Sequence, residues 1–194
     1  MENLKAIESS EGLRVISCLN FRSMEGLDRY ETNFNVSIGY CNNIKNLKGM
    51  SFLHNGDLKL IHCHRLSSLK GMPLEINGNL QLGGLGNLNS LNYLPAKISG
   101  TIGIMECKIS KYKKMVWETT MSEEEAKEKV TFYHKVSKEI VEDLGQKESF
   151  FNKIHIKTIT EEEFQFRKEV GLDERNAPVV MGKIPVSATT PKIT

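Results

Sequence analysis

The sequence lacks the features that mark several large classes of protein. Its 194 residues contain no run of about 18 apolar residues, so we expect no membrane-spanning helix. Neither sign of charge dominates, because 26 basic residues accompany 24 acidic ones. This balance argues against a nucleic-acid-binding surface or a groove for acidic substrates. The segment MENLKAIESSEG has no apolar stretch like that of a secretory signal, so we expect a cytoplasmic protein with reduced cysteines.

Motifs of the common catalytic classes are also missing. The sequence has no G-x-S-x-G nucleophile motif and no G-x-x-x-x-G-K-[ST] phosphate-binding loop. The glycine-rich GGLG at 83–86 follows an apolar alternation and does not precede a helical pattern. We therefore expect neither an enzyme nor a bound cofactor.

The stretch His62-Cys63-His64 contains three residues of types that commonly bind metal ions. If Cys63 points into a core along a strand-like segment, its two neighbours point outward, and the three side chains cannot converge on one ion. A structural zinc site needs four ligands in paired spacings, and the remaining histidines, at 54, 134 and 155, supply no second pair. No metal site is expected.

What the sequence does contain is a period of 22 residues. Pairs of apolar residues separated by one position recur with steps of 23, 22, 22 and 22 residues. The pairs are Leu13/Val15, Val36/Ile38, Leu58/Leu60, Leu80/Leu82 and Ile102/Ile104. Each pair predicts a short strand with one buried face, and the Asn-Gly steps between units predict turns with positive φ. One unit cannot bury its own apolar face, so the units must stack into a parallel ladder around a shared core.

The cysteines fall at one phase of this period. Five residues after the start of each pair stand Cys18, Cys41, Cys63, Leu85 and Cys107, so all four cysteines share one repeat position. A small apolar side chain packs well at an inward bend. Cys41 and Cys63, on neighbouring strands, could be close enough for a disulfide, but Cys107 is two strands from Cys63. Buried packing by free thiols is the favoured interpretation.

The pattern Leu58-x-Leu60-x-x-Cys63-x-x-Leu66 resembles the leucine-rich repeat. The sequence of Ser67 to Leu82, SSLKGMPLEINGNLQL, is similar to the short repeats of bacterial and T4-like phage proteins. The resemblance covers residues 11–110. It implies an α/β fold, namely a right-handed leucine-rich-repeat solenoid of about five short parallel strands. The segments opposite the strands are too short for helices and should be extended or form one tight turn.

The period ends near residue 110, and a helical region is predicted at 111–171. Ser122 with Glu125 forms a capping-box pattern, and apolar residues at spacings of three and four predict one amphipathic helix from there to Leu144 with Gly145 as its stop. A second capping box, Thr160 with Glu163, predicts a helix ending at Gly171. The alternation around Ile154 could be a strand or a linker. Residues 172–194 contain three prolines and predict an extended, disordered tail.

These C-terminal elements leave alternatives open. They can cap the last repeat, with Trp117 packing the junction, or form a separate effector or dimerisation unit. Three functions follow from these possibilities. The chain could recognise a protein, it could assemble into homo-oligomers through the helix at 122–144, or it could carry an enzyme site at the junction with residues such as His134 and Glu139.

Protein recognition is the favoured function, because the predicted concave strand face is mixed in character. The face carries an aromatic residue, apolar side chains and isolated charges, and it lacks the clustered cations of a nucleic-acid site. The candidate partner-binding residues are Arg14, Tyr40, Lys59, His62, Gln81 and Glu106. The resemblance to phage repeats suggests an inhibitor of a host defence protein that acts in the host cytoplasm.

Overall fold

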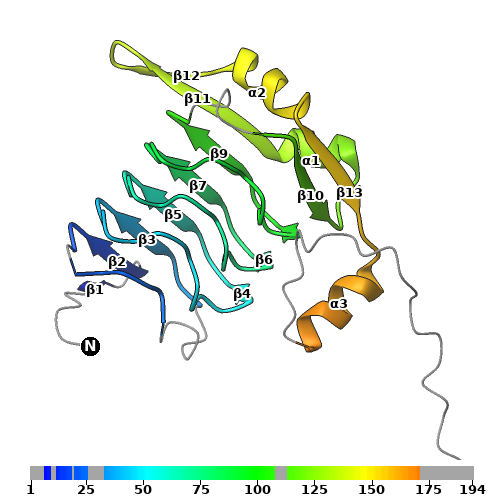
Figure 1. The fold of residues 1–194 in the computed structure, drawn as a ribbon, viewed down its shortest axis with the longest axis horizontal. Helices are drawn as coiled ribbons and strands as arrows, with labels where there is room; N and C mark the ends of the chain where they lie inside the picture. Colours follow the sequence, from blue (N-terminus) through cyan, green and yellow to red (C-terminus); the bar gives the residue numbers. More distant parts are fainter. Residues whose placement is uncertain (1–6, 10–11, 19, 26–32, 108–112, 171–194) are drawn as a thin grey trace, which may run out of the picture.

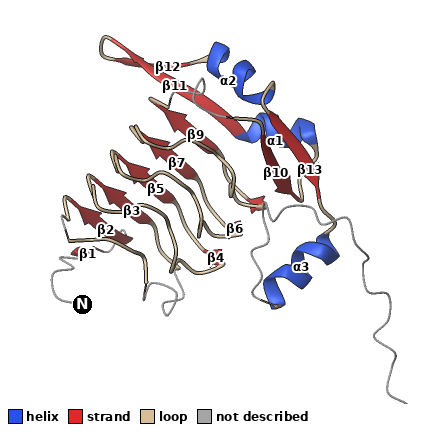
Figure 2. Ribbon diagram, viewed as in Figure 1, coloured by secondary structure: helices blue, strands red, loops and turns tan. Residues whose placement is uncertain are grey.

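The computed structural model describes residues 7–9, 12–18, 20–25, 33–107 and 113–170, with only the backbone described at 7–9. It shows an α/β protein built on a mostly parallel sheet, with three helices in the described part of the chain (Figure 1; Figure 2). Eight strands form the main sheet in the order β1-β2-β3-β5-β7-β9-β11-β12. The predicted tail at 172–194 and the expected end of the last helix at Gly171 lie outside the described residues.

The five strands predicted from the period are confirmed. They are β2 (Gly12–Ile16), β3 (Val36–Gly39), β5 (Leu58–Ile61), β7 (Leu80–Gly83) and β9 (Ile102–Met105). Each pairs in parallel with the next so that equivalent repeat positions are direct neighbours, as where Leu58 lies between Val36 and Leu80. At one edge, β1 (Ile7–Ser9) pairs antiparallel with β2.

The segments opposite the main sheet are extended, as predicted. β4 (Leu53–His54), β6 (Glu75–Ile76) and β8 (Lys97–Ile98) form a second, three-stranded parallel sheet. The two sheets enclose columns of buried leucine, isoleucine and cysteine. Cys41, Cys63 and Cys107 are buried, Cys18 is half-buried, and all four are free thiols.

Polar ladders tie successive repeats together at the turns. The Asn55 side chain donates to Asn33 and the Asn77 side chain donates to Asn55, both at 2.8 Å. Beside this ladder, the Asn79 backbone N–H donates to the Asp57 carboxylate, also at 2.8 Å. Each of these bonds joins residues 22 positions apart, so they hold neighbouring repeats in a single register.

Glycine in the turns is required mainly because neighbouring repeats approach so closely. A Cβ added to Gly78 would lie 2.3 Å from the backbone oxygen of Gly56, although the φ of Gly78 is not in the left-handed region. Gly56 does have a positive φ, as the Asn-Gly pattern predicts. The turn expectation is therefore correct for Gly56 and wrong for Gly78, where lack of space excludes any larger residue.

The predicted long helix over 122–144 is wrong. α1 spans only Glu123–Lys129, and the chain then forms the hairpin of β11 (Val130–Val136) and β12 (Glu139–Glu142). The run VTFYHKV is rich in β-branched and aromatic residues, which favour strands. β11 pairs in parallel with β9, so the last repeat strand gains hydrogen bonds that an isolated helix could not offer. The helix start was correct, since the Ser122 hydroxyl accepts the Glu125 backbone N–H.

A further helix, not predicted, follows the hairpin. This helix is α2 (Leu144–Phe151), and Asp143 is its N-cap residue. The Asp143 carboxylate accepts the backbone N–H of Gln146 at 2.9 Å. Gly145 therefore lies in the first turn of a helix and does not stop one. Phe150 of α2 is buried and packs against Phe132 of β11, with ring centroids 5.3 Å apart. The core thus continues from the repeats into the C-terminal segment.

A two-stranded parallel sheet completes the C-terminal segment. β10 (Met115–Thr119) pairs with β13 (Ile154–Thr158), which decides the open question about the alternation around Ile154 in favour of a strand. Trp117 of β10 is buried, as expected for the junction, and its indole N–H donates to the Pro95 carbonyl at 2.9 Å.

α3 (Glu161–Glu169) packs beside the three-stranded sheet, at the lower right of Figure 1. Its predicted start is confirmed, because the Thr160 hydroxyl accepts the Glu163 backbone N–H. Phe164 is buried in a small cluster with Leu74, Ala96 and Ile159. Ion pairs surround this cluster: Lys168 contacts Glu75 at 2.9 Å, and Lys97 contacts Glu161 at 2.9 Å.

The Glu118 carboxylate anchors α3 and should make stability depend on pH. It is 11% exposed and contacts Arg167 at 2.8 Å and Lys157 at 2.7 Å. Burial alone raises the pKa of this carboxyl, but the hydrogen bonds from Arg167 and Lys157 outweigh burial and leave the pKa below its ordinary value of 4.5. Because the pKa is lower in the folded chain, this group stabilises the fold above pH 4.5 and loses that effect on acidification.

We expect the free energy of unfolding to fall between about pH 5 and about pH 3, partly through Glu118. Glu118→Gln should lower stability at neutral pH by about 1–3 kcal/mol and make the acid-side decline shallower. Urea unfolding at a series of pH values measures both effects. Glu162→Gln, at an exposed position of α3, is the control. An unchanged pH profile in Glu118→Gln would contradict this role.

Candidate partner-binding face

The outward side of the eight-stranded sheet, opposite the buried columns, is called here the open face. Parallel pairing places one straight row of side chains across it, from β2 to β9. The row runs Arg14, Ser37, Lys59, Gln81 and Gly103, each in direct register with the next. Three of the six candidate residues, Arg14, Lys59 and Gln81, are therefore brought into one line.

The other three candidates, Tyr40, His62 and Glu106, lie just past the strand ends in an unusual backbone conformation. Their φ angles are 56°, 52° and 56°, and Gly84 at the equivalent position has a φ of 59°. Left-handed backbone is uncommon for residues other than glycine and is costly for a bulky side chain. The sequence hardly indicates this left-handed conformation, because glycine occurs at the position only as Gly84.

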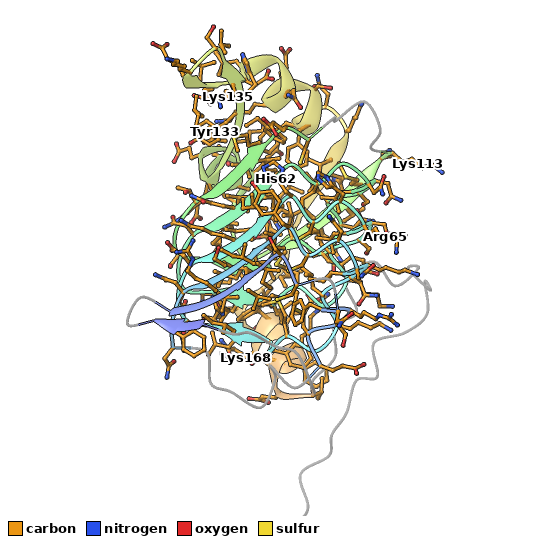
Figure 3. All side chains as sticks on the ribbon, turned by 90° about the vertical axis from the view of Figure 1, so that its left-hand side faces the viewer. His62, Arg65, Lys113, Tyr133, Lys135 and Lys168 are labelled. Atoms are coloured by element: carbon orange, nitrogen blue, oxygen red, sulfur yellow. The ribbon has the colours of Figure 1, made fainter. Side chains whose placement is uncertain are left out.

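Tyr40 and His62 form a stacked pair at the open face. Their ring centroids are 4.9 Å apart with an interplanar angle of 29°. A Cβ on Gly84 would lie 2.2 Å from Nδ1 of His62, so the imidazole occupies the space that a side chain at 84 would need. His64, which the sequence left without a role, continues the group with its ring 5.9 Å from that of His62. Figure 3 shows His62 below Tyr133 and Lys135 of the hairpin.

Glycines open an apolar hollow farther along the same face. The hollow has a volume of about 250 Å³. Gly83 and Gly103 leave room at its base, and the walls come from Ile61, Met105, Tyr133 and Ile140. Gly83 of the glycine-rich GGLG thus helps to shape this surface. Sequence reasoning missed Tyr133 and Ile140, because it placed them on a helix, and the strand-like VTFYHKV was the signal that could have found them.

A polar depression lies at the other end of the row. Its lining includes Arg14, Ser37, Lys59, Asn35 and Asp57. Among the residues that the structure describes, neither Arg14 nor Lys59 forms an ion pair. The cations on the opposite side, Lys97 and Lys168, are by contrast each paired with a glutamate. In the part of the chain that the structure describes, these two cations of the open face thus lack an ion-pair partner, although Asp57 lies in the same depression.

The other chemical candidates lie apart from this face. The Cys41 thiol has its pKa raised to about 11, chiefly by burial, so it stays protonated and is a poor nucleophile. His134 Nδ1 lies 3.3 Å from Asp143 of the α2 cap, whereas Glu139 is exposed at the hairpin end. Within the described ranges, no group of three or more histidine, cysteine, aspartate or glutamate side chains could hold a metal ion.

In the described part of the chain, every helix is too short or too polar to cross a bilayer. No protein-family model, curated protein or solved structure matches the chain.

Proposed function

We propose that the chain is a leucine-rich-repeat solenoid that recognises a protein partner through its open face, without catalysis. The 22-residue period and the in-register parallel strands support the repeat assignment. The C-terminal segment serves as the cap of the last repeat, because β11 pairs with β9. Without β11, the outer edge of β9 would be exposed. The similarity of the repeats to phage repeats extends the proposal to an inhibitor of a host protein in the host cytoplasm.

One observation carries this proposal above all, namely the apolar hollow near the exposed Tyr40, whose ring stacks on the half-buried His62. Residues that dominate binding energy in protein interfaces are large side chains seated in preformed pockets. The hollow provides such a pocket, and Ile140 in its wall is 63% exposed. The neighbouring Tyr40 is also exposed, and its ring is held by the stack with His62. Exposed apolar groups arranged in this way are typical of a contact surface.

The alternative of self-assembly through a helix over 122–144 loses the element on which it depended, because that segment forms α1 and a hairpin. The alternative of an enzyme site at the junction also loses support. The junction is filled by the packed rings of Phe132, Phe150 and Phe151. We therefore favour recognition over both.

Gly103→Val should abolish partner binding and leave the fold intact. A Cβ at position 103 meets Tyr133 at 3.5 Å, an ordinary contact, and the larger side chain then occupies the hollow. Valine also suits a strand better than glycine, so we expect stability to stay level or rise by about 0.5–1 kcal/mol. Thermal unfolding measures the stability. Binding is measured by capture from lysates of candidate host bacteria, followed by calorimetry with the purified captured protein.

The matched control is Val116→Ala, which trims an exposed apolar residue on β10, outside the hollow. This variant should capture the same protein as the wild type in equal amount. If Gly103→Val also retained full capture, the hollow would not be the recognition site and the proposal would fail.

A further inference from the structure

We propose that the partner segment recognised by the open face carries an acidic side chain and, about three to four residues away, a large apolar one. This inference rests on the proposed function and specifies the chemistry of the partner. It is carried by the row from Arg14 to Gly103, which has a cationic end and an apolar end.

The cationic end consists of Arg14, Ser37 and Lys59 on three neighbouring strands. Strands lie about 4.8 Å apart, so the two cations bracket the serine hydroxyl at a spacing that lets both reach one carboxylate. Asp57 lines the same depression and keeps its negative charge, and its Oδ1 accepts the backbone N–H of Asn79 at 2.8 Å and the Asn79 side chain at 3.0 Å. None of the ion pairs in the described part of the chain joins Asp57 to Arg14 or Lys59, so two cations face one acid there. The depression therefore keeps an excess of positive charge that can attract an outside anion.

The apolar end is the hollow based on Gly103. Its volume is about 250 Å³. This is room for one aromatic or long aliphatic side chain. Its walls of Ile61, Met105, Tyr133 and Ile140 offer such a side chain apolar and aromatic contacts. Water released from this hollow favours binding of an apolar group over a polar one.

The separation of the two ends sets the spacing in the partner. Ser37 is on β3, and the hollow is centred two to three strands farther, at β7 and β9. This is about 10–14 Å, which an extended chain spans in about three to four residues at about 3.3 Å each. Gln81 lines the side of the hollow nearer the cations and is exposed, so its amide can bond the backbone of a segment lying along the row.

The test uses a displayed library of random 12-residue peptides, selected in parallel on the full wild-type chain, on Lys59→Glu and on Gly103→Val. On the wild type we expect enrichment of peptides with Asp or Glu three to four positions from Phe, Trp, Leu or Met. Lys59→Glu should remove the acidic preference and keep the apolar one. Gly103→Val should remove the apolar preference and keep the acidic one.

One enriched peptide is then synthesised and its affinity measured by fluorescence anisotropy. Lys59→Glu should weaken binding at least tenfold, and a peptide with its acidic residue changed to lysine should recover most of that loss. Lys59→Gln, a milder change, should give a smaller loss. Lys70→Glu, an exposed position outside the row, is the charge control and should leave the affinity unchanged.

The outcomes separate this inference from the proposed function. Enrichment of peptides without the acidic and apolar pair, with binding still lost in Gly103→Val, would overturn the inference and leave the proposed function standing. If every enriched peptide bound Gly103→Val and Tyr40→Ala as tightly as the wild type, the open face would not be a recognition surface. The inference and the proposed function would then both fail.

Discussion

Gly71→Ala is expected to destabilise the fold by about 3–5 kcal/mol, a large part of the stability of a typical domain. Gly71 has a φ of 91°, and a Cβ there would lie 2.4 Å from the backbone of Leu47 and Lys48 in the preceding repeat. Because backbone cannot rotate away as a side chain can, the two repeats must separate or the turn must change. Urea unfolding followed by circular dichroism measures the loss.

Gly86→Ala is the matched control for this change. It lies in the same stack of repeats, but a Cβ there meets only the His64 ring, at 3.8 Å, and its φ is not left-handed. We expect this variant to unfold within about 0.5 kcal/mol of the wild type. Equal midpoints for Gly71→Ala and the wild type would show that the repeats do not approach at this turn as described.

Phe164→Ala is expected to cost about 3–5 kcal/mol and to release α3 from the repeats. The ring is fully buried with Leu74, Ala96 and Ile159, so its removal leaves a cavity in a cluster too small to close around it. The pairs of Lys97 with Glu161 and of Lys168 with Glu75 are partly exposed and add little, which leaves the buried Arg167–Glu118 pair as the main remaining contact of the helix. Hydrogen exchange should therefore accelerate at 161–169, while the strands from β3 to β9 remain protected.

Phe166→Ala removes the same side chain two positions away, where the ring is 60% exposed. This control should alter stability by no more than about 0.5 kcal/mol and leave exchange in α3 unchanged. A Phe164→Ala variant with normal protection at 161–169 would mean that α3 is held by something other than this cluster.

The repeat strands were predictable because one physical requirement recurs in them. Each strand must bury alternate residues against its neighbours, so pairs such as Leu58/Leu60 appear at a fixed interval that the sequence displays directly. The same argument placed Cys63 in the core and His62 outside it. It could not reveal the left-handed backbone at His62, since nothing in the residue type requires that conformation.

The hairpin was missed because its apolar residues fit two periods at once. Val130, Tyr133 and Val136 recur at helical spacing, but the strand edge of β9 provides a partner that the sequence alone does not show. Tertiary pairing then overrides the local helical pattern that begins at Ser122. The hollow depends on this hairpin, so its outer wall at Tyr133 and Ile140 could not be predicted before the topology was known.

The strict register of the repeats fixes the distance between the two ends of the row from Arg14 to Gly103. The cations at Arg14 and Lys59 and the hollow at Gly103 are separated by whole strands, each contributed by one 22-residue unit. Gain or loss of one unit between them would change their separation by one strand spacing, about 4.8 Å, without altering either end. Under the proposed function, duplicating or deleting a unit would therefore change the spacing recognised in a partner, with no new side-chain chemistry.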